Sequence, residues 1–145
     1  MNNNYLITAG ILSCIASLAH IAIIFGGPDW YRFFGAGEGM AIMAEKGLIK
    51  PTLITIFIAT VLFVWGLYAF SATGLLPKFP FLKFCLIVIT CVYLFRGLAG
   101  LIALFFPEIS YVKELGISFL LWSSLICSLI GIIHMIGLTQ VWSKL

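Results

Sequence analysis

Charged residues are scarce in this chain, and their scarcity limits what the protein can be. Eight basic and five acidic residues make up 9% of the 145 positions, whereas an ordinary soluble domain has about 25%. Hydrophobic residues account for 63%, and the mean hydropathy is +1.19. So few polar side chains cannot cover a water-facing surface, which excludes a soluble enzyme. The charges lie between apolar runs rather than on one face, so no nucleic-acid partner is expected.

Four long apolar runs dominate the sequence, at residues 5–25, 51–76, 84–106 and 115–143. A helix needs about 20 residues to cross roughly 30 Å of hydrocarbon, and each run is long enough. The strands of a membrane barrel are shorter and alternate in polarity, unlike these runs. The sequence therefore predicts an all-α integral membrane protein with one domain, residues 1–145. It is a four-transmembrane-helix bundle with helices at about 5–26, 51–76, 82–106 and 115–142.

Prolines are absent from the middle of these runs, because all five lie at the ends of the runs or between them. A proline inside a helix removes a backbone hydrogen bond and clashes with the preceding turn, so this distribution supports the helix boundaries. The longest connection, residues 28–50, is too apolar to extend freely into water. Its glycines around Glu38 permit sharp turns, and residues 40–46 have a helical pattern. We therefore predict that this connection is a partly helical lid packed on the bundle.

Basic residues are divided too evenly between the two sides for their count to fix the orientation. Three lie on the side that holds both termini and four on the other: Lys78, Lys83 and Lys144, against Arg32, Lys46, Lys50 and Lys113. All five acids fall on the second side, which leaves the first side purely cationic. We therefore predict that both termini are cytoplasmic.

The first run has an alternative interpretation. Residues Ser17, Leu18 and Ala19 resemble the cleavage end of a signal peptide, and cleavage would leave a three-helix protein that begins at His20. The preceding segment has no Lys or Arg, however, and the apolar run continues to Phe25. We therefore favour a retained first helix.

Paired cysteines and metal-ligand clusters are also missing. The four cysteines form no Cys-x-x-Cys pair and lie within or near the start of predicted helices, so we interpret them as small apolar side chains rather than redox thiols. His20 and His134 differ in predicted depth by roughly 18 Å, at about 1.5 Å per helical residue. One haem or metal ion cannot bind both. The sequence predicts no metal site, no cofactor and no catalytic residue.

Arg96 is the one charge inside an apolar run. An arginine in mid-helix costs about 2.5 to 3.5 kcal/mol on insertion scales, so it should face the bundle, a water-filled cleft or an anionic partner. No predicted helix contains Asp or Glu, which leaves the lid as the nearest source of a carboxylate. Glu38 is the first candidate partner, with Asp29 and Glu45 as substitutes. His20 is expected within roughly 6 Å of Arg96 in depth.

This arrangement has two interpretations. In the structural one, a buried Arg96–Glu38 pair fixes the lid on the bundle. In the functional one, Arg96, His20, Glu38 and Arg32 form a candidate ligand-binding site, in which Arg96 holds an anionic group and His20 exchanges a proton. We give the structural interpretation slightly more weight, and both remain open at this point.

A second polar cluster is predicted deeper in the bundle. His134, Tyr68 and Ser71 have similar predicted depths, and Trp65 lies one turn away. These four residues are a second candidate ligand site. The simpler interpretation is that His134 hydrogen-bonds Tyr68 or Ser71 across helices, and we favour it.

Several stretches carry a family resemblance: WYRFFGAGEGMAIMAEKG at 30–47, VWGLYAFSATG at 64–74, YLFRGL at 93–98 and the histidine of IGIIHMIGL. With these motifs the chain resembles a family of small four-helix membrane proteins of proteobacteria. The resemblance implies a location in the bacterial inner membrane. It implies no activity, cofactor or catalytic residue.

The lack of a helix carboxylate also argues against a proton-coupled exporter of cations, which needs one. Three functions remain. We rank first a binding or accessory protein that holds a lipid, isoprenoid or quinone-like ligand or supports a membrane complex. A transporter of an anionic or lipid-headgroup substrate through Arg96 comes second, and a membrane enzyme third. The expected partners are membrane lipid and either a second copy or another membrane protein.

Overall fold

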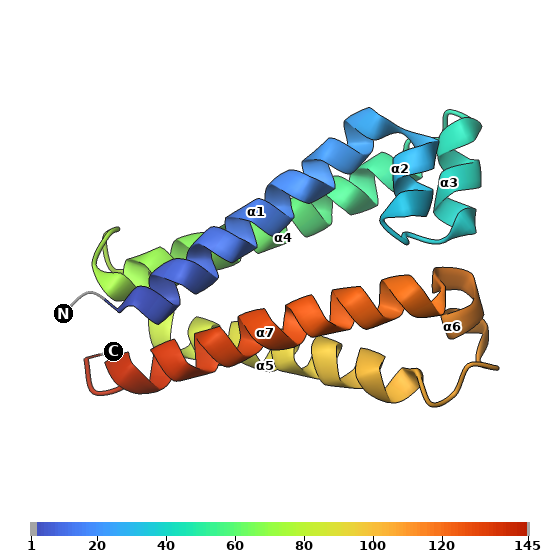
Figure 1. The fold of residues 1–145 in the computed structure, drawn as a ribbon. Helices are drawn as coiled ribbons and strands as arrows, with labels where there is room; N and C mark the ends of the chain where they lie inside the picture. The colour runs from blue at the N-terminus through green and yellow to red at the C-terminus, as the bar shows by residue number, and fades with distance from the viewer. Residues whose placement is uncertain (1–2, 145) are drawn as a thin grey trace.

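The computed structural model describes residues 3–144, and every regular element in that part of the chain is a helix (Figure 1). Four helices are long and apolar enough to cross a membrane: α1 (Asn4–Gly26), α4 (Lys50–Thr73), α5 (Leu82–Ala103) and α7 (Ile117–Val141). Three short helices connect them: α2 (Pro28–Phe33), α3 (Glu38–Glu45) and α6 (Ser110–Leu115). The predicted all-α membrane bundle with a partly helical lid is therefore confirmed.

The long helices form two antiparallel pairs, α1 with α4 and α5 with α7 (Figure 1). The pairs meet at one end, which holds residues 3 and 144 and the loop 74–81, and which we name the terminal end. They spread apart toward the opposite end, which holds α2, α3 and α6 and which we name the lid end. The bundle is thus a V of two helix pairs rather than four equally packed helices.

Small residues allow the helices within each pair to approach closely. A Cβ atom added to Gly66 of α4 would lie 2.7 Å from Cys14 Sγ and 3.0 Å from the Gly10 carbonyl oxygen of α1. In the other pair, a Cβ on Gly97 would lie 2.7 Å from the backbone nitrogen of Ser128. Lipid provides no hydrophobic force between helices, so this close backbone packing is what holds each pair together.

Several contacts join the two pairs in the half of the bundle nearer the terminal end, three of them at α1. The Asn3 side chain donates a 2.7 Å hydrogen bond to the Gly137 carbonyl, and a Cβ on Gly137 would lie 2.7 Å from Leu6 Cγ. Farther along α1, the Ser13 and Tyr93 hydroxyls lie 2.9 Å apart in a buried hydrogen bond. We name this set of contacts the seam, and it links α1 to both helices of the other pair.

The lid spans the two pairs at the lid end. Its buried residues Tyr31 and Ala41 pack on Ile23 of α1. The ring of Phe119 from α7 covers Gly35, where a Cβ would lie only 2.1 Å from the ring. The positive φ of Gly35, +64°, also requires glycine at this turn. The lid therefore rests on both arms of the V.

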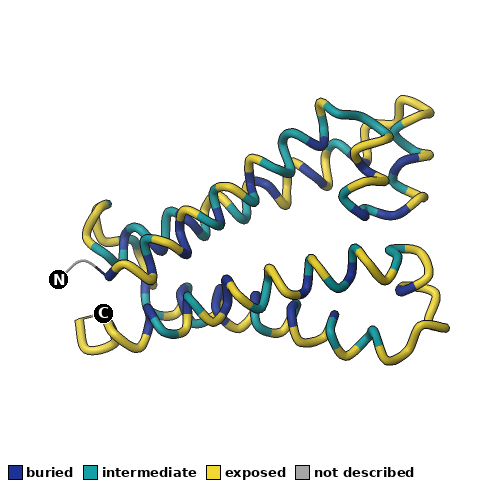
Figure 2. The backbone as a smooth tube through the Cα atoms, in the orientation of Figure 1, coloured by how far each residue is buried: buried dark blue, intermediate teal, exposed yellow. Residues whose placement is uncertain are grey.

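Each long helix buries only part of its circumference, as the alternation of buried and exposed positions in Figure 2 shows. Large apolar side chains are exposed on every long helix, among them Leu18, Phe57, Phe95 and Trp122. Such a surface would be unfavourable in water but is the expected surface of a membrane protein in lipid.

Candidate functional site

Arg96 lies on the face of α5 that packs against α7. Its Nη1 donates to Ser124 Oγ at 3.4 Å, and its Nη2 donates to Ser123 Oγ at 3.3 Å. Gly100, one turn farther along α5, makes room for the guanidinium, because a Cβ there would lie 2.7 Å from Arg96 Nη1. Both hydrogen bonds are long, so they are weak for a charged donor.

Arg96 forms no ion pair with any residue in the described part of the chain, 3–144. The prediction that Glu38 pairs with Arg96 is therefore wrong. Glu38 binds Arg32 instead, through Nε at 3.0 Å and Nη2 at 2.7 Å. Arg32 is six residues away in sequence, so this pair closes a short loop at little entropic cost, whereas Arg96 lies on a distant helix.

Arg32 organises the lid rather than the Arg96 site. Besides Glu38 it pairs with Glu45 at 2.7 Å and with Asp29 at 3.6 Å, and so connects α2 to both ends of α3. Hydrogen bonds to Glu38 and Glu45 raise the pKa of Arg32 above its ordinary value. The same guanidinium lowers the pKa of Glu38. These two members of the predicted site therefore have a structural role in the lid.

His20 lies on α1 at nearly the same depth as Arg96. Its Nδ1 is 2.8 Å from the Ala16 carbonyl oxygen of its own helix, so Nδ1 donates to that carbonyl and Nε2 has no part in this bond. His20 follows Ser13 by two turns, and Ser13 contacts Tyr93 of α5. The spacing places His20 on the face of α1 that is directed toward the other pair. No hydrogen bond or ion pair joins His20 to Arg96 within residues 3–144.

Helix lengths place these polar groups at one level. Arg96 is seven residues before the end of α5, Ser124 is seven after the start of α7, and His20 is six before the end of α1. At about 1.5 Å per residue, each lies roughly 10 Å inside the lid-end terminus of its helix. The structure thus brings Arg96 together with two serines that sequence reasoning had not assigned to the site. The sequence signal that could have identified these serines is their depth, which equals that of Arg96 on the adjacent antiparallel helix.

The second predicted cluster is arranged differently from the prediction. His134 is fully buried, and neither ring nitrogen has a hydrogen-bond partner among the described residues. Its ring stacks on Tyr93, with centroids 5.7 Å apart, and Trp65 packs edge-on against the same tyrosine at 5.1 Å. These three aromatic residues lie next to the seam at Ser13, so they contribute to joining the two pairs.

Tyr68 and Ser71 do not bond His134, so that predicted hydrogen bond is wrong. Ser71 Oγ donates to the Pro77 carbonyl at 2.7 Å and accepts from the Phe79 backbone nitrogen at 3.0 Å. Tyr68 donates to the Pro80 carbonyl at 3.4 Å. The loop 74–81 folds back on the end of α4 and offers these carbonyls locally, which removes both hydroxyls from His134.

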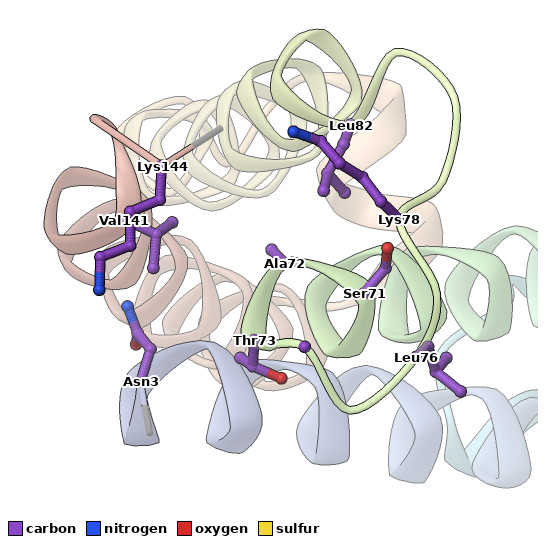
Figure 3. Close-up of a pocket in the computed structure, with 10 residues that line it drawn as sticks. Asn3, Ser71, Ala72, Thr73, Leu76, Lys78, Leu82, Val141 and Lys144 are labelled. Atoms are coloured by element: carbon purple, nitrogen blue, oxygen red, sulfur yellow. The ribbon is translucent and has the colours of Figure 1, made fainter. Parts of the chain in front are cut away.

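Two cavities open at the ends of the bundle. One of about 400 Å³ lies at the terminal end (Figure 3), and we name it the terminal cavity. The other, of about 350 Å³, lies beneath the lid between the end of α1 and the start of α4, and Tyr31 lines it. Neither is lined by Arg96 or His20. All four cysteines are free, and residues 3–144 contain no group of three His, Cys, Asp or Glu side chains placed to hold a metal ion.

The fold and the polar groups within it define a class: a four-helix multi-pass membrane protein with an arginine inside a membrane-spanning segment and serines as its neighbours. Comparisons with protein-family models, with curated proteins and with solved structures find no match. The function is therefore argued from the geometry of the chain itself.

Proposed function

We propose that this chain is a membrane-embedded binding protein that holds an acidic amphiphile beside α5 and α7, with Arg96 as the cationic ligand of the head group. The observation that carries this proposal is the environment of Arg96. Its guanidinium lies in a membrane-spanning helix and has two serine hydroxyls, but no carboxylate, as hydrogen-bond partners.

A guanidinium in this position favours a negatively charged ligand. It has five N–H donors, and the two serine bonds use only part of that capacity. The serine hydroxyls accept hydrogen bonds from the guanidinium, but they are neutral and do not balance its positive charge. Of the lipid, isoprenoid and quinone ligands expected from the sequence, an acidic lipid or isoprenyl phosphate is favoured because its head group supplies the missing charge.

The surface near Arg96 supports the same class of ligand. Phe95 of α5 and Trp122 of α7, next in sequence to Arg96 and Ser123, are exposed. They offer an apolar surface on which the tail of an amphiphile can lie. His20 offers Nε2 at a similar depth, as an acceptor for a protonated head group.

Binding is better supported than transport or catalysis. A transporter would have to admit water to Arg96 from both ends, and the seam of Asn3, Ser13, Tyr93 and Gly137 joins the two pairs between Arg96 and the terminal end. Catalysis would need an acid, base or nucleophile within hydrogen-bond reach of a ligand at Arg96. Ser123 and Ser124 could act as nucleophiles only with a base to activate them, and their printed hydrogen-bond partners are Arg96 and the Leu120 carbonyl, not an Asp, Glu or His.

We also propose that the protein resides in the bacterial inner membrane with both termini cytoplasmic. The resemblance of its motifs to a family of proteobacterial membrane proteins supports the location in the inner membrane. The distribution of charge supports the orientation, because Lys78, Lys83 and Lys144 lie at the terminal end and all acids lie at the lid end.

Native mass spectrometry after gentle extraction tests the binding function. The wild-type protein should retain an acidic lipid or isoprenoid, and Arg96→Gln should lose it while keeping its helical content and thermal transition. Lys46→Gln, an exposed lid residue, removes the same charge and should leave the ligand bound. A wild-type protein without any retained acidic amphiphile, or equal retention by Arg96→Gln, would contradict the proposal.

A further inference from the structure

The chain passes from one helix pair to the other only once within residues 3–144. Helices α1, α2, α3 and α4 follow one another in the first pair and its lid, and α5, α6 and α7 follow one another in the second. The loop 74–81, which links α4 to α5, lies at the terminal end (Figure 1). At the lid end the two pairs are therefore held at a given separation by non-covalent contacts alone.

The tip of the lid supplies such contacts. Gly35 and Gly37 lie in the turn between α2 and α3, and both are buried. Phe119 of α7 covers Gly35, and Glu114 of α6 covers Gly37, where a Cβ would lie 2.9 Å from Glu114 Oε1. The positive φ values of the two glycines, +64° and +90°, allow the turn to approach these side chains. We name these four residues the clasp.

The Glu114 carboxylate lies at the N-terminus of α3. Gly37 directly precedes this eight-residue helix, and no side chain caps it. In the first turn, a Cβ on Gly39 would also lie 3.6 Å from Glu114 Oε1. The free N–H groups and the dipole of a helix N-terminus attract a carboxylate, and Glu38 in the same turn is already paired with Arg32. Glu114 therefore adds electrostatic attraction to the clasp, and Phe119 adds packing.

The lid is anchored to the first pair by contacts of a different kind. Tyr31 and Ala41 pack on Ile23 of α1, and Thr55 of α4 donates a hydrogen bond to the Tyr31 hydroxyl at 3.3 Å. The ion pairs of Arg32 connect α2 to α3 within the lid. The lid is thus fixed to α1 and α4 as one body, and the clasp is the joint that can open.

We propose that the clasp is a releasable gate, whose opening lets the two helix pairs swing apart at the lid end. The seam, in the half of the bundle nearer the terminal end, is the hinge about which they turn. Opening widens the approach to the face of α1 that carries His20, roughly 10 Å inside the lid-end terminus of that helix. The gate therefore controls entry from the lid side, and it does not depend on whether Arg96 binds an anion.

Distances between spin labels test this gate. Phe25 at the end of α1 and Phe105 after α5 are exposed at the lid end, and p-acetylphenylalanine at both positions takes a ketone-reactive label that leaves the native cysteines unmodified. Double electron–electron resonance in lipid nanodiscs should show mainly a short distance when the clasp is intact. Phe119→Ala should raise the ratio of long-distance to short-distance molecules about tenfold. Phe84→Ala, exposed on α5 at the terminal end, is the matched control and should leave the ratio unchanged.

Charge at Gly39 tests the electrostatic part in both directions. The space at Gly39 admits a side chain, because a Cβ there meets Glu114 at an ordinary contact distance. Gly39→Asp places like charges together and should favour the long distance, whereas Gly39→Lys should favour the short one. In the background of Glu114→Gln the two variants should no longer differ. Glu108→Gln, which removes the same charge from the exposed partner of Lys113, should leave the distances unchanged.

Three results would overturn the gate. The first is a labelled protein with an intact clasp that already shows the long distance in the same proportion as Phe119→Ala. The second is an unchanged distance in Phe119→Ala when circular dichroism shows that its helical content is kept. The third is a shift in the same direction from Gly39→Asp and Gly39→Lys. Gly39 is exposed, so its two variants decide the matter even if Phe119→Ala fails to fold.

Discussion

The two ends of the bundle handle charge in opposite ways. At the lid end, cations and acids occur together, and Arg32 alone pairs with three carboxylates. At the terminal end, lysines occur far from every Asp and Glu of the chain, and Lys83 instead contacts the ring and the carbonyl of Trp142. Ion pairs with carboxylates therefore stabilise the lid end, whereas the terminal end depends on packing and on hydrogen bonds to backbone carbonyls.

Arg96 takes no part in the ion pairs of the lid end, although it lies close to the lid. Its serine partners leave its charge uncompensated by the described chain. The lid acids that could have reached it are already engaged by Arg32. The internal pairing of the lid is thus consistent with the absence of a carboxylate partner for Arg96 among the described residues.

The largest expected effect concerns topology, because it is all or none. Reporter fusions at residue 78 and after residue 144 should show the cytoplasmic signal, and a fusion near residue 45 should show the periplasmic one. The reason is that a purely cationic end is retained in the cytoplasm. A periplasmic signal from residue 78 would reverse the assignment of the two ends.

The next effect compares anchors at the two ends. Leu6→Ala removes a fully buried side chain from the terminal end and should lower the free energy of unfolding of the whole bundle by about 3 kcal/mol. Tyr31→Ala also removes a fully buried side chain, under the lid, but it should mainly release residues 28–50, because Tyr31 packs them on Ile23 at the end of α1. Thermal unfolding in micelles and limited proteolysis measure the two outcomes.

The exposed residue Leu18 of α1 provides the control, since Leu18→Ala should leave both readouts nearly unchanged. If Tyr31→Ala lowered the global transition as much as Leu6→Ala, the lid would be part of the cooperative core. The contrast between a structural terminal end and a separately folding lid would then be wrong.

Helices and depths could be predicted from the sequence, whereas lateral partners could not. Each of the four apolar runs is long enough to cross the membrane as a helix, so the four spans could be predicted. The rise per residue of a helix gave the depth of Arg96 within its span. Depth does not specify the direction of a side chain around its helix axis. Glu38 and Arg96 could therefore be compared in height, but only the fold shows that Arg32 takes the carboxylate.

The positions of Tyr68 and Ser71 and the presence of helix α6 also could not be predicted from the sequence. Tyr68 and Ser71 have the depth of His134 but turn toward the loop 74–81, whose course no periodicity reveals. Helix α6 ends at Leu115, before Gly116, where φ is +82°. It has only six residues and lies just before the fourth apolar run, and so short a helix shows no periodicity in the sequence.

A smaller effect is expected from acid. Arg32 lowers the pKa of Glu38 below its ordinary value of 4.5, so their interaction stabilises the lid above that pH and is lost as the pH falls through the lowered pKa. Proteolysis of residues 28–50 should therefore accelerate in the wild type as the pH falls below the ordinary pKa of 4.5 and through the lowered pKa of Glu38. Arg32→Gln should show the faster cleavage already at neutral pH, with a weaker dependence on acid. A lid that is cleaved at the same rate by wild type and variant would show that the charge network does not hold it.

The smallest expected effect tests whether every ion pair at the lid end contributes to stability. Lys113 binds Glu108 at 2.6 Å, but both side chains are largely exposed, at 59% and 87%. Water screens such a pair and its ordering costs side-chain entropy, so Lys113→Gln should change the free energy of unfolding by less than about 0.5 kcal/mol. Arg32 differs because one guanidinium connects two helices through several carboxylates. Thermal unfolding of the Lys113→Gln and Arg32→Gln variants measures the difference. If Lys113→Gln lowered the free energy of unfolding by more than about 1 kcal/mol, isolated surface pairs would also stabilise this end, and not the Arg32 network alone.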